Sequence, residues 1–223
     1  MLIEPELLGT GARILTSVAS GAALALAAIS APWRAWLGDR ELQWVWLLSL
    51  GLLVGVWSMK AGITPGFSLR FLMVTALTLM HGWPLAVIGC AMVLAVLCVV
   101  GQASWASFGA DLLCVAVVPA LFSAWLHEHV HARLPHNYFI YFFVTTFLGS
   151  ALAFCLAGLV RLGLMAASGT LDPAQVGPEF FAILPLMSFG EAVANGTIVA
   201  MAVIYRPRWV MSFDDKLYLA PGR

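Results

Sequence analysis

The stretch PGFSLRFLMVTALTLMHGWPLAVIGCAMVLAVLCVVG, residues 65–101, decides the fold class of this chain. It is apolar almost throughout, and its one break, HGWP at residues 81–84, divides it into two hydrophobic pieces. Roughly 20 helical residues cross the hydrocarbon core of a bilayer, so the piece at 69–80 is short for a span and the piece at 85–100 is near the usual length. We therefore expect a central membrane hairpin whose first half is tilted, short or partly shielded by protein.

The composition places the whole chain in a membrane. Of its 223 residues, 62% are hydrophobic and only 10% are charged, and the mean hydropathy is +0.95. A soluble domain of this length needs more charge on the surface that faces water. The formal net charge is zero, which gives no electrostatic reason for a nucleic-acid partner. We expect one integral membrane domain over residues 1–223, with the lipid bilayer around it.

Further apolar runs flank the central hairpin. They cover residues 14–33, 42–59, 112–126, 138–164 and 180–205. The first of them is rich in Ala, Gly and Ser, a composition that lets membrane helices approach closely. Together with the hairpin they predict an all-α, polytopic bundle of seven membrane helices, or of six if residues 69–80 are only partly inserted.

Lysine and arginine predict the orientation, because cytoplasmic loops carry an excess of them. With seven spans, one side of the membrane holds Arg34, Arg40, Arg133, Arg206, Arg208, Lys216 and Arg223. The other side holds Arg13, Lys60, Arg70 and Arg161. We expect a bacterial inner-membrane protein with its N-terminus outside and its C-terminal tail, residues 206–223, in the cytoplasm.

The sequence HEHVH at residues 127–131 matches the zincin motif H-E-x-x-H. On a helix, His127 and His131 share a face and are able to bind Zn²⁺, with Glu128 as general base. A metalloprotease also needs a third ligand, and the acidic candidates in the spans are Asp111 and Glu191. Asp111 lies roughly 24 Å away along a continuous helix, at the opposite membrane face, and Glu191 is nearer mid-membrane. The other interpretations are a solvated helix end at the cytoplasmic interface and incidental metal binding.

Four more polar residues interrupt the apolar runs. His81 stands at the hairpin turn, either as a polar turn residue or as a ligand. Arg70 begins the hairpin near the opposite face, where it either snorkels or lines a cavity. Glu191 lies deep in the last span with Asn195 one turn later on the same face, which predicts either a transport pathway or an interhelical hydrogen bond.

Other established motifs are missing from the sequence. It has no P-loop, no G-x-S-x-G and no dinucleotide-binding glycine pattern, so the chain cannot hydrolyse ATP by itself. Four cysteines lie inside apolar runs without C-x-x-C spacing, which is typical of small buried side chains rather than of disulfides or metal ligands. They are Cys90, Cys98, Cys114 and Cys155.

Three blocks of the sequence resemble the CbiM-like permeases, the membrane substrate-binding components of energy-coupling factor (ECF) cobalt/nickel transporters. They are PGFSLRFLMVTALTLMHGWPLA at 65–86, FGADLLCVAVVPALFSAWL at 108–126 and FGEAVANGTIVAMAVIYRPRWV at 189–210. The tail FDDKLYL at 213–219 adds a likeness to a proteobacterial branch of that family. The resemblance implies capture of a small substrate from outside, with a transmembrane coupling protein and ATPase subunits as partners. It also implies Ni²⁺ or Co²⁺ as cargo, no resident cofactor, and transport rather than catalysis.

The same resemblance implies a ligand set that this chain lacks. The family holds its metal with a histidine at the second position, helped by a histidine early in the central hairpin. Here these positions are Leu2 and Arg70, and neither side chain supplies an imidazole nitrogen. His81 is expected toward the cytoplasm, opposite the outward-facing site.

We expect a cavity between the central hairpin and the last span. The substrate-pathway candidates are Arg70, Asp111, Glu191 and Asn195. The candidate metal ligands are His81, His127 and His131. Two alternatives stay open: an intramembrane zinc metalloprotease that uses His127, Glu128 and His131, and a membrane assembly protein that transports nothing.

Overall fold

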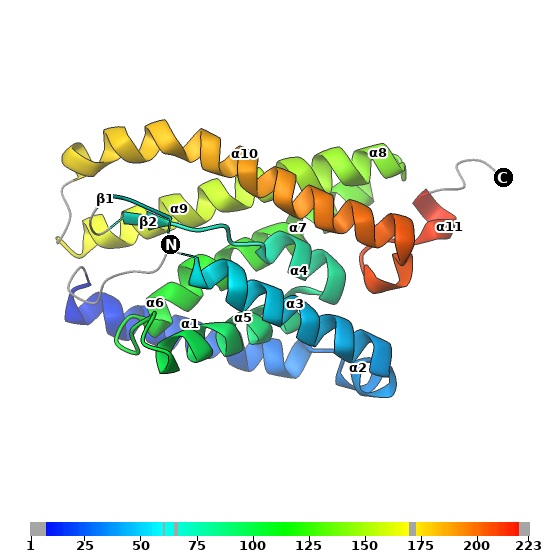
Figure 1. Ribbon diagram of the computed structural model, residues 1–223, viewed down its shortest axis with the longest axis horizontal. Helices are drawn as coiled ribbons and strands as arrows, with labels where there is room; N and C mark the ends of the chain where they lie inside the picture. Colours follow the sequence, from blue (N-terminus) through cyan, green and yellow to red (C-terminus); the bar gives the residue numbers. More distant parts are fainter. Residues whose placement is uncertain (1–7, 60, 65–66, 170–172, 219–223) are drawn as a thin grey trace.

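The computed structural model describes residues 8–59, 61–64, 67–169 and 173–218, and Figure 1 shows a bundle of helices that lie side by side. In chain order the elements are α1 (Thr10–Ser30), α2 (Trp33–Gly38), α3 (Arg40–Ser58), β1 (Ala61–Thr64), β2 (Phe67–Leu69), α4 (Val74–His81), α5 (Trp83–Val99), α6 (Phe108–Leu112), α7 (Val118–Arg133), α8 (Tyr138–Ile140), α9 (Gly149–Ala167), α10 (Pro173–Tyr205) and α11 (Asp215–Tyr218). The π-helical segments Leu113–Val117 and Tyr141–Leu148 join α6 to α7 and α8 to α9, and the 3-10 turn Pro207–Trp209 follows α10.

Helices α1, α3 and α5 make up one side of the bundle, and α7, α9 and α10 make up the other (Figure 1). Helix α4 lies between the two sides and packs against α5, α7 and α10. Within the described ranges, five stretches are long and apolar enough to cross a membrane: Thr10–Ser30, Arg40–Ser58, Phe108–Arg133, Tyr138–Ala167 and Phe181–Tyr205. Helix α5, with 17 residues, supplies a sixth, shorter one. The expected helical membrane bundle is confirmed.

The remaining passage through the bundle is only half helical. Helix α4 has 8 residues, which is about 12 Å of helix against a hydrocarbon core of about 30 Å. Figure 1 shows the strand pair β1–β2 at one end of the bundle and an extended segment that leads from it to α4. In its described ranges, the chain therefore passes seven times between the two ends of the bundle, six times as a helix and once as an extended segment followed by α4. This is the short first half that the sequence predicts for the hairpin.

The end of α4 follows directly from the HGWP sequence. Gly82 has a φ of 81°, which favours glycine, and its N–H donates to the carbonyl of Thr78 over 2.8 Å. Pro84 then lies in the first turn of α5, where its missing N–H leaves no intrahelical bond unmade. The tight turn between α4 and α5 is therefore encoded locally.

The strand pair was not predicted from the sequence. Strands β1 and β2 run antiparallel, with Ala61 opposite Leu69 and Gly62 opposite Ser68. This pairing satisfies backbone N–H and C=O groups of both segments within the protein. Apart from this hairpin, the elements of the described chain are helices and helical turns.

The cysteines occupy the positions expected of apolar side chains. Cys90, Cys98 and Cys114 are buried, Cys155 is partly buried, and all four are free thiols. The central core cluster, which includes Cys90, unites residues of α3, α5 and α7 with Leu72 and Val74 at the start of α4. Helix α4 packs against this core on one side. Hydrogen bonds from side chains of α10 hold its first turn.

Small residues bring α1 close to α6. A Cβ atom on Gly109 would lie 2.6 Å from the Cα of Ser17, and the hydroxyl of Ser20 donates to the carbonyl of Gly109 over 2.5 Å. The two backbones can approach this closely only because residue 109 has no side chain. The Ala/Gly/Ser-rich composition of the first span therefore has the packing role expected of it.

We predict that Gly109→Ala destabilises the protein by about 1–3 kcal/mol, because the added methyl group meets backbone rather than a movable side chain. The measurement is thermal unfolding in detergent micelles. Gly21→Ala on α1 is the matched control, since a Cβ there meets nothing within 4 Å. Equal melting temperatures for the two variants would contradict the close contact of α1 with α6.

Candidate functional site

Two polar side chains of α10 hold the start of α4 inside the bundle. The carboxylate of Glu191 accepts from the backbone N–H of Leu72 over 2.8 Å and from that of Met73 over 2.6 Å. The side-chain oxygen of Asn195 accepts from the N–H of Ala76 over 2.7 Å. The first N–H groups of a helix have no intrahelical acceptor, and in lipid each unsatisfied one costs several kcal/mol. Glu191 and Asn195 therefore supply the hydrogen-bond acceptors that a preceding helical turn would otherwise provide.

Glu191 and Asn195 also bond to each other. The amide nitrogen of Asn195 donates over 2.8 Å both to the carboxylate and to the backbone carbonyl of Glu191. The two side chains are 1% and 0% exposed, so water does not satisfy them. The negative carboxylate also lies at the positive end of the α4 dipole, a favourable electrostatic arrangement. These contacts support the interhelical-bond interpretation of the pair, and its role in a substrate pathway stays a prediction.

Local backbone geometry and a small residue bring the partners together. Met73, which precedes α4, has a φ of 57°, a left-handed conformation that is uncommon outside glycine. This conformation aims successive N–H groups at one acceptor, as in anion-binding backbone nests. Next to Glu191, a Cβ atom on Gly190 would lie 2.9 Å from the ring of Phe71. Glycine at this position therefore lets residues 71–73 lie directly on α10.

Arg70 and Asp111 form the other half of this buried polar region. Arg70 is 7% exposed and donates from Nη1 to the backbone carbonyl of Trp57. Asp111 is fully buried, accepts from the Ser107 hydroxyl over 2.9 Å, and attracts the Arg70 guanidinium electrostatically. The Nε atom of Arg70 has no hydrogen-bond partner in the described part of the chain. Arg70 is therefore buried and held in place rather than extended to the membrane surface.

The four substrate-pathway candidates thus fall into two pairs joined by residues 70–73. Arg70 is matched in charge by Asp111, and Glu191 is matched by the start of α4 and by Asn195. Arg161, on α9, is another buried cation. Both Arg161 and Asp111 act electrostatically on the thiol of Cys114. The charge of Arg70 offsets that of Asp111, and the carboxylate of Glu191 is already engaged by three N–H donors. Neither pair presents a free carboxylate to a bare divalent cation.

The histidine candidates lie elsewhere. His81 ends α4, is buried, and has Nε2 at 3.3 Å from the Ser49 hydroxyl, as a polar turn residue would. His127 and His131, near the end of α7, have ring centroids 5.9 Å apart. In the part of the chain that the structure describes, no group of three His, Cys, Asp or Glu side chains comes together in a way that holds a metal ion.

The H-E-x-x-H motif ends a helix, and the C-terminal segment packs against it. Nδ1 of His131 lies 3.0 Å from the hydroxyl of Tyr218, and its ring meets that of His136 edge-on at 4.5 Å. Burial raises the pKa of the Tyr218 hydroxyl, which keeps that group neutral beside the imidazole. Glu128 is exposed. These positions are those of a polar helix end that docks the α11 segment.

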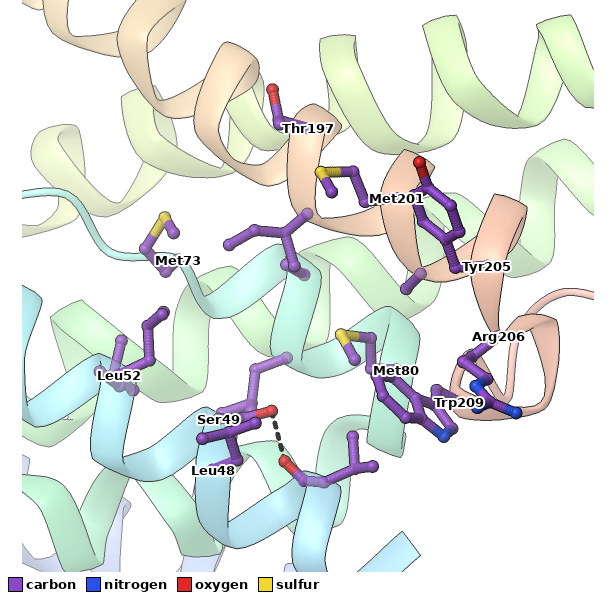
Figure 2. A pocket seen from close by; sticks show the side chains of 16 residues that line it. Leu48, Ser49, Leu52, Met73, Met80, Thr197, Met201, Tyr205, Arg206 and Trp209 are labelled. Atoms are coloured by element: carbon purple, nitrogen blue, oxygen red, sulfur yellow. Dashed lines mark hydrogen bonds between the residues drawn. The ribbon is translucent and has the colours of Figure 1, made fainter. Parts of the chain in front are cut away.

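A groove does open between the central hairpin and the last span, but the polar candidates are not among its lining residues. It has a volume of about 480 Å³ and lies between α3, α4 and α10 (Figure 2). Met73, Leu52, Met80, Met201, Tyr205 and Trp209 are among its lining residues, whereas Arg70, Asp111, Glu191 and Asn195 are not. None of these four residues lines this groove, and their place in a substrate pathway stays a prediction. Its lining along α3 and α10 is mostly apolar, so no sequence signal distinguished it from ordinary lipid-facing surface.

We predict that Asn195→Leu lowers the free energy of unfolding by about 1–3 kcal/mol, because it leaves the N–H of Ala76 without an acceptor. Thermal unfolding in detergent micelles is again the measurement. The control is Thr197→Val on the same helix, whose hydroxyl bonds back to the carbonyl of Val193 over 2.8 Å and holds no other element. A melting temperature for Asn195→Leu equal to that of Thr197→Val would refute the anchoring role.

Comparison with known proteins agrees with this architecture. The model of the CbiM family, described as the cobalt uptake substrate-specific transmembrane region, matches residues 3–209. The crystal structure of a truncated transition metal transporter superposes with a TM-score of 0.76, covering 92% of this chain and 99% of that chain. At 15% identity, this likeness shows the fold alone. Comparison with curated proteins finds no match. Because the family model extends over nearly the whole chain, the chain belongs to the CbiM family.

Proposed function

We propose that this protein is the membrane-embedded, substrate-binding component of a transition-metal uptake system of the ECF type. The match of the cobalt-uptake family model to residues 3–209 carries the proposal. The shared fold of a truncated transition metal transporter supports it. So does the broken third passage, because discontinuous helices with buried polar groups near mid-membrane are where transporters place their substrates.

Energy for uptake must come from partner subunits, since the sequence has no P-loop. We propose a transmembrane coupling protein and ATPase subunits as these partners, as the family resemblance implies. The basic residues Arg34, Arg40, Arg133, Arg206 and Arg208 belong to the end of the bundle where α10 finishes. This end is proposed to face the cytoplasm of a bacterial inner membrane, with the N-terminus outside.

The cargo is proposed to arrive with ligands of its own. Position 2 is leucine, and Arg70 stands where the family resemblance implies a second histidine. A guanidinium stays protonated and has no lone pair for Ni²⁺ or Co²⁺. It does bind carboxylates and other anions well. A cobalt or nickel complex with an anionic chelator fits these residues better than the bare ion.

The test is uptake of radiolabelled cobalt or nickel by cells that express the chain together with ECF coupling and ATPase subunits. We predict metal accumulation above that of cells without the chain. Arg70→Gln is expected to reduce metal accumulation about ten-fold, because it removes one charge-assisted hydrogen bond to the cargo. Arg34→Gln, an exposed cation at the other end, is the matched control. Membrane levels of each variant are measured alongside.

Two further arms separate the alternatives. Cobalt citrate and cobalt chloride are offered in parallel, and a preference for the citrate complex that Arg70→Gln removes supports the chelate. Glu128→Gln is expected to leave uptake unchanged, because Glu128 is exposed at the end of α7. Uptake that fails in Glu128→Gln but survives in Arg70→Gln would contradict the proposed site, and no uptake with any metal form would contradict transport itself.

A further inference from the structure

The apolar groove between α3, α4 and α10 opens to the surroundings of the bundle. Several of its wall residues are more than half exposed, namely Leu48 at 70%, Leu52 at 51%, Met201 at 53% and Tyr205 at 72%. In a membrane this surface faces lipid. The groove exists because α4 is short and set back between α3 and α10, with Ala76, Leu77 and Met80 lining its floor.

The groove has the depth of one membrane leaflet. Its α10 wall runs from Thr197 to Tyr205, the last residue of the helix, which is nine residues or about 13 Å of helix. Half of a hydrocarbon core is about 15 Å thick. Figure 2 shows Met73 and Leu52 at one end of the groove and Arg206 with Trp209 at the other. The first end lies at the level of the break before α4, and the second lies where α10 ends.

The two ends differ in chemistry. Ser49 and Thr197 contribute hydroxyls to the groove, but both donate to carbonyls of their own helices. The end of the groove near Arg206 carries Tyr205 and Trp209, residue types that are enriched at the headgroup level of membranes. The groove therefore changes from apolar to polar in the same direction as a phospholipid does.

Arg206 supplies the charge at the polar end. It lines the groove and is exposed. The neighbouring carboxylates are engaged otherwise: Glu41 accepts from Nε1 of Trp209 over 2.7 Å, and Asp39 lies 4.0 Å from Arg208. Within the described ranges, no carboxylate forms an ion pair with Arg206. The guanidinium is thus available to an anionic group outside the protein.

We propose that this groove is a binding site for one anionic phospholipid, with an acyl chain along α4 and the phosphate at Arg206. Basic pockets between membrane helices bind anionic headgroups in this way. A partner helix is a poorer fit, because helix–helix contacts in membranes use small residues and these walls carry Leu, Met and Tyr. A lipid in this groove covers Ala76, Leu77 and Met80 of α4 and leaves the buried polar region of Arg70 and Asp111 untouched.

The experiment is native mass spectrometry of the full-length protein after delipidation in detergent. Phosphatidylglycerol and phosphatidylcholine with identical acyl chains are added separately, and bound lipid is counted. We expect one retained phosphatidylglycerol and weaker binding of phosphatidylcholine. Arg206→Gln is expected to weaken phosphatidylglycerol about five-fold, the effect of one cation near a membrane surface. Arg34→Gln, another exposed cation at the same end, is expected to change nothing.

A second pair of variants tests the apolar part of the groove. Leu52→Trp fills it, and we expect it to abolish retention of the lipid. Leu26→Trp, at a lipid-exposed position on α1 outside the groove, is the control. Equal retention in Leu52→Trp and Leu26→Trp would overturn the proposal, as would equal affinity for the two lipids. Copurification of a partner subunit that Leu52→Trp disrupts, with lipid binding unchanged, would assign the groove to that subunit instead.

Discussion

The hydrogen bonds from the backbone of residues 72, 73 and 76 to Glu191 and Asn195 are the interaction on which the rest of this structure depends. A membrane helix ordinarily satisfies its own backbone, and a helix that begins in mid-membrane cannot do so. One carboxylate and one amide on α10 remove that penalty for α4. Without them, the extended segment before α4 would have to become helix or leave the bundle.

This single interruption produces two different environments. On the side of the strand pair, the extended segment places Arg70 in a buried polar region where the charge of Asp111 attracts it. On the other side, the shortness of α4 leaves the apolar groove between α3 and α10. The proposed cargo belongs to the first environment and the proposed lipid to the second, so the two can be altered separately. The charges of the polar region balance within the protein, which favours a cargo whose own charge is largely neutralised by its ligands.

Much of the architecture was predictable from hydropathy. The apolar runs, the short first half of the hairpin and the HGWP turn all depend on local sequence, and local rules govern membrane helices strongly because each must satisfy its own backbone. The strand pair was missed because Pro65-Gly66, a turn signal, lies in an apolar context that masks the short strands beside it. The family resemblance came from ordered blocks of sequence rather than from any one residue.

The site was less predictable. Glu191 and Asn195 were identifiable as costly buried groups, but their partners are backbone N–H groups more than 100 positions away. Backbone donors leave no trace in a sequence, so the choice between a pathway and an interhelical bond stayed open. The groove was beyond sequence reasoning for a related reason: lipid-facing and groove-lining residues have the same apolar composition. The H-E-x-x-H match illustrates the reverse case, a complete motif whose third ligand is missing from the described structure.

Hydrogen exchange of the segment that contains residues 70–81, measured in lipid nanodiscs, tests the central claim most directly. The account predicts that the amides of Leu72, Met73 and Ala76 exchange as slowly as those inside α5, and that Asn195→Leu accelerates Ala76 while leaving α5 unchanged. Rapid exchange of these three amides in the unaltered protein, as fast as in the exposed turn between α7 and α8, would show that α4 is not anchored by α10 and would contradict the account.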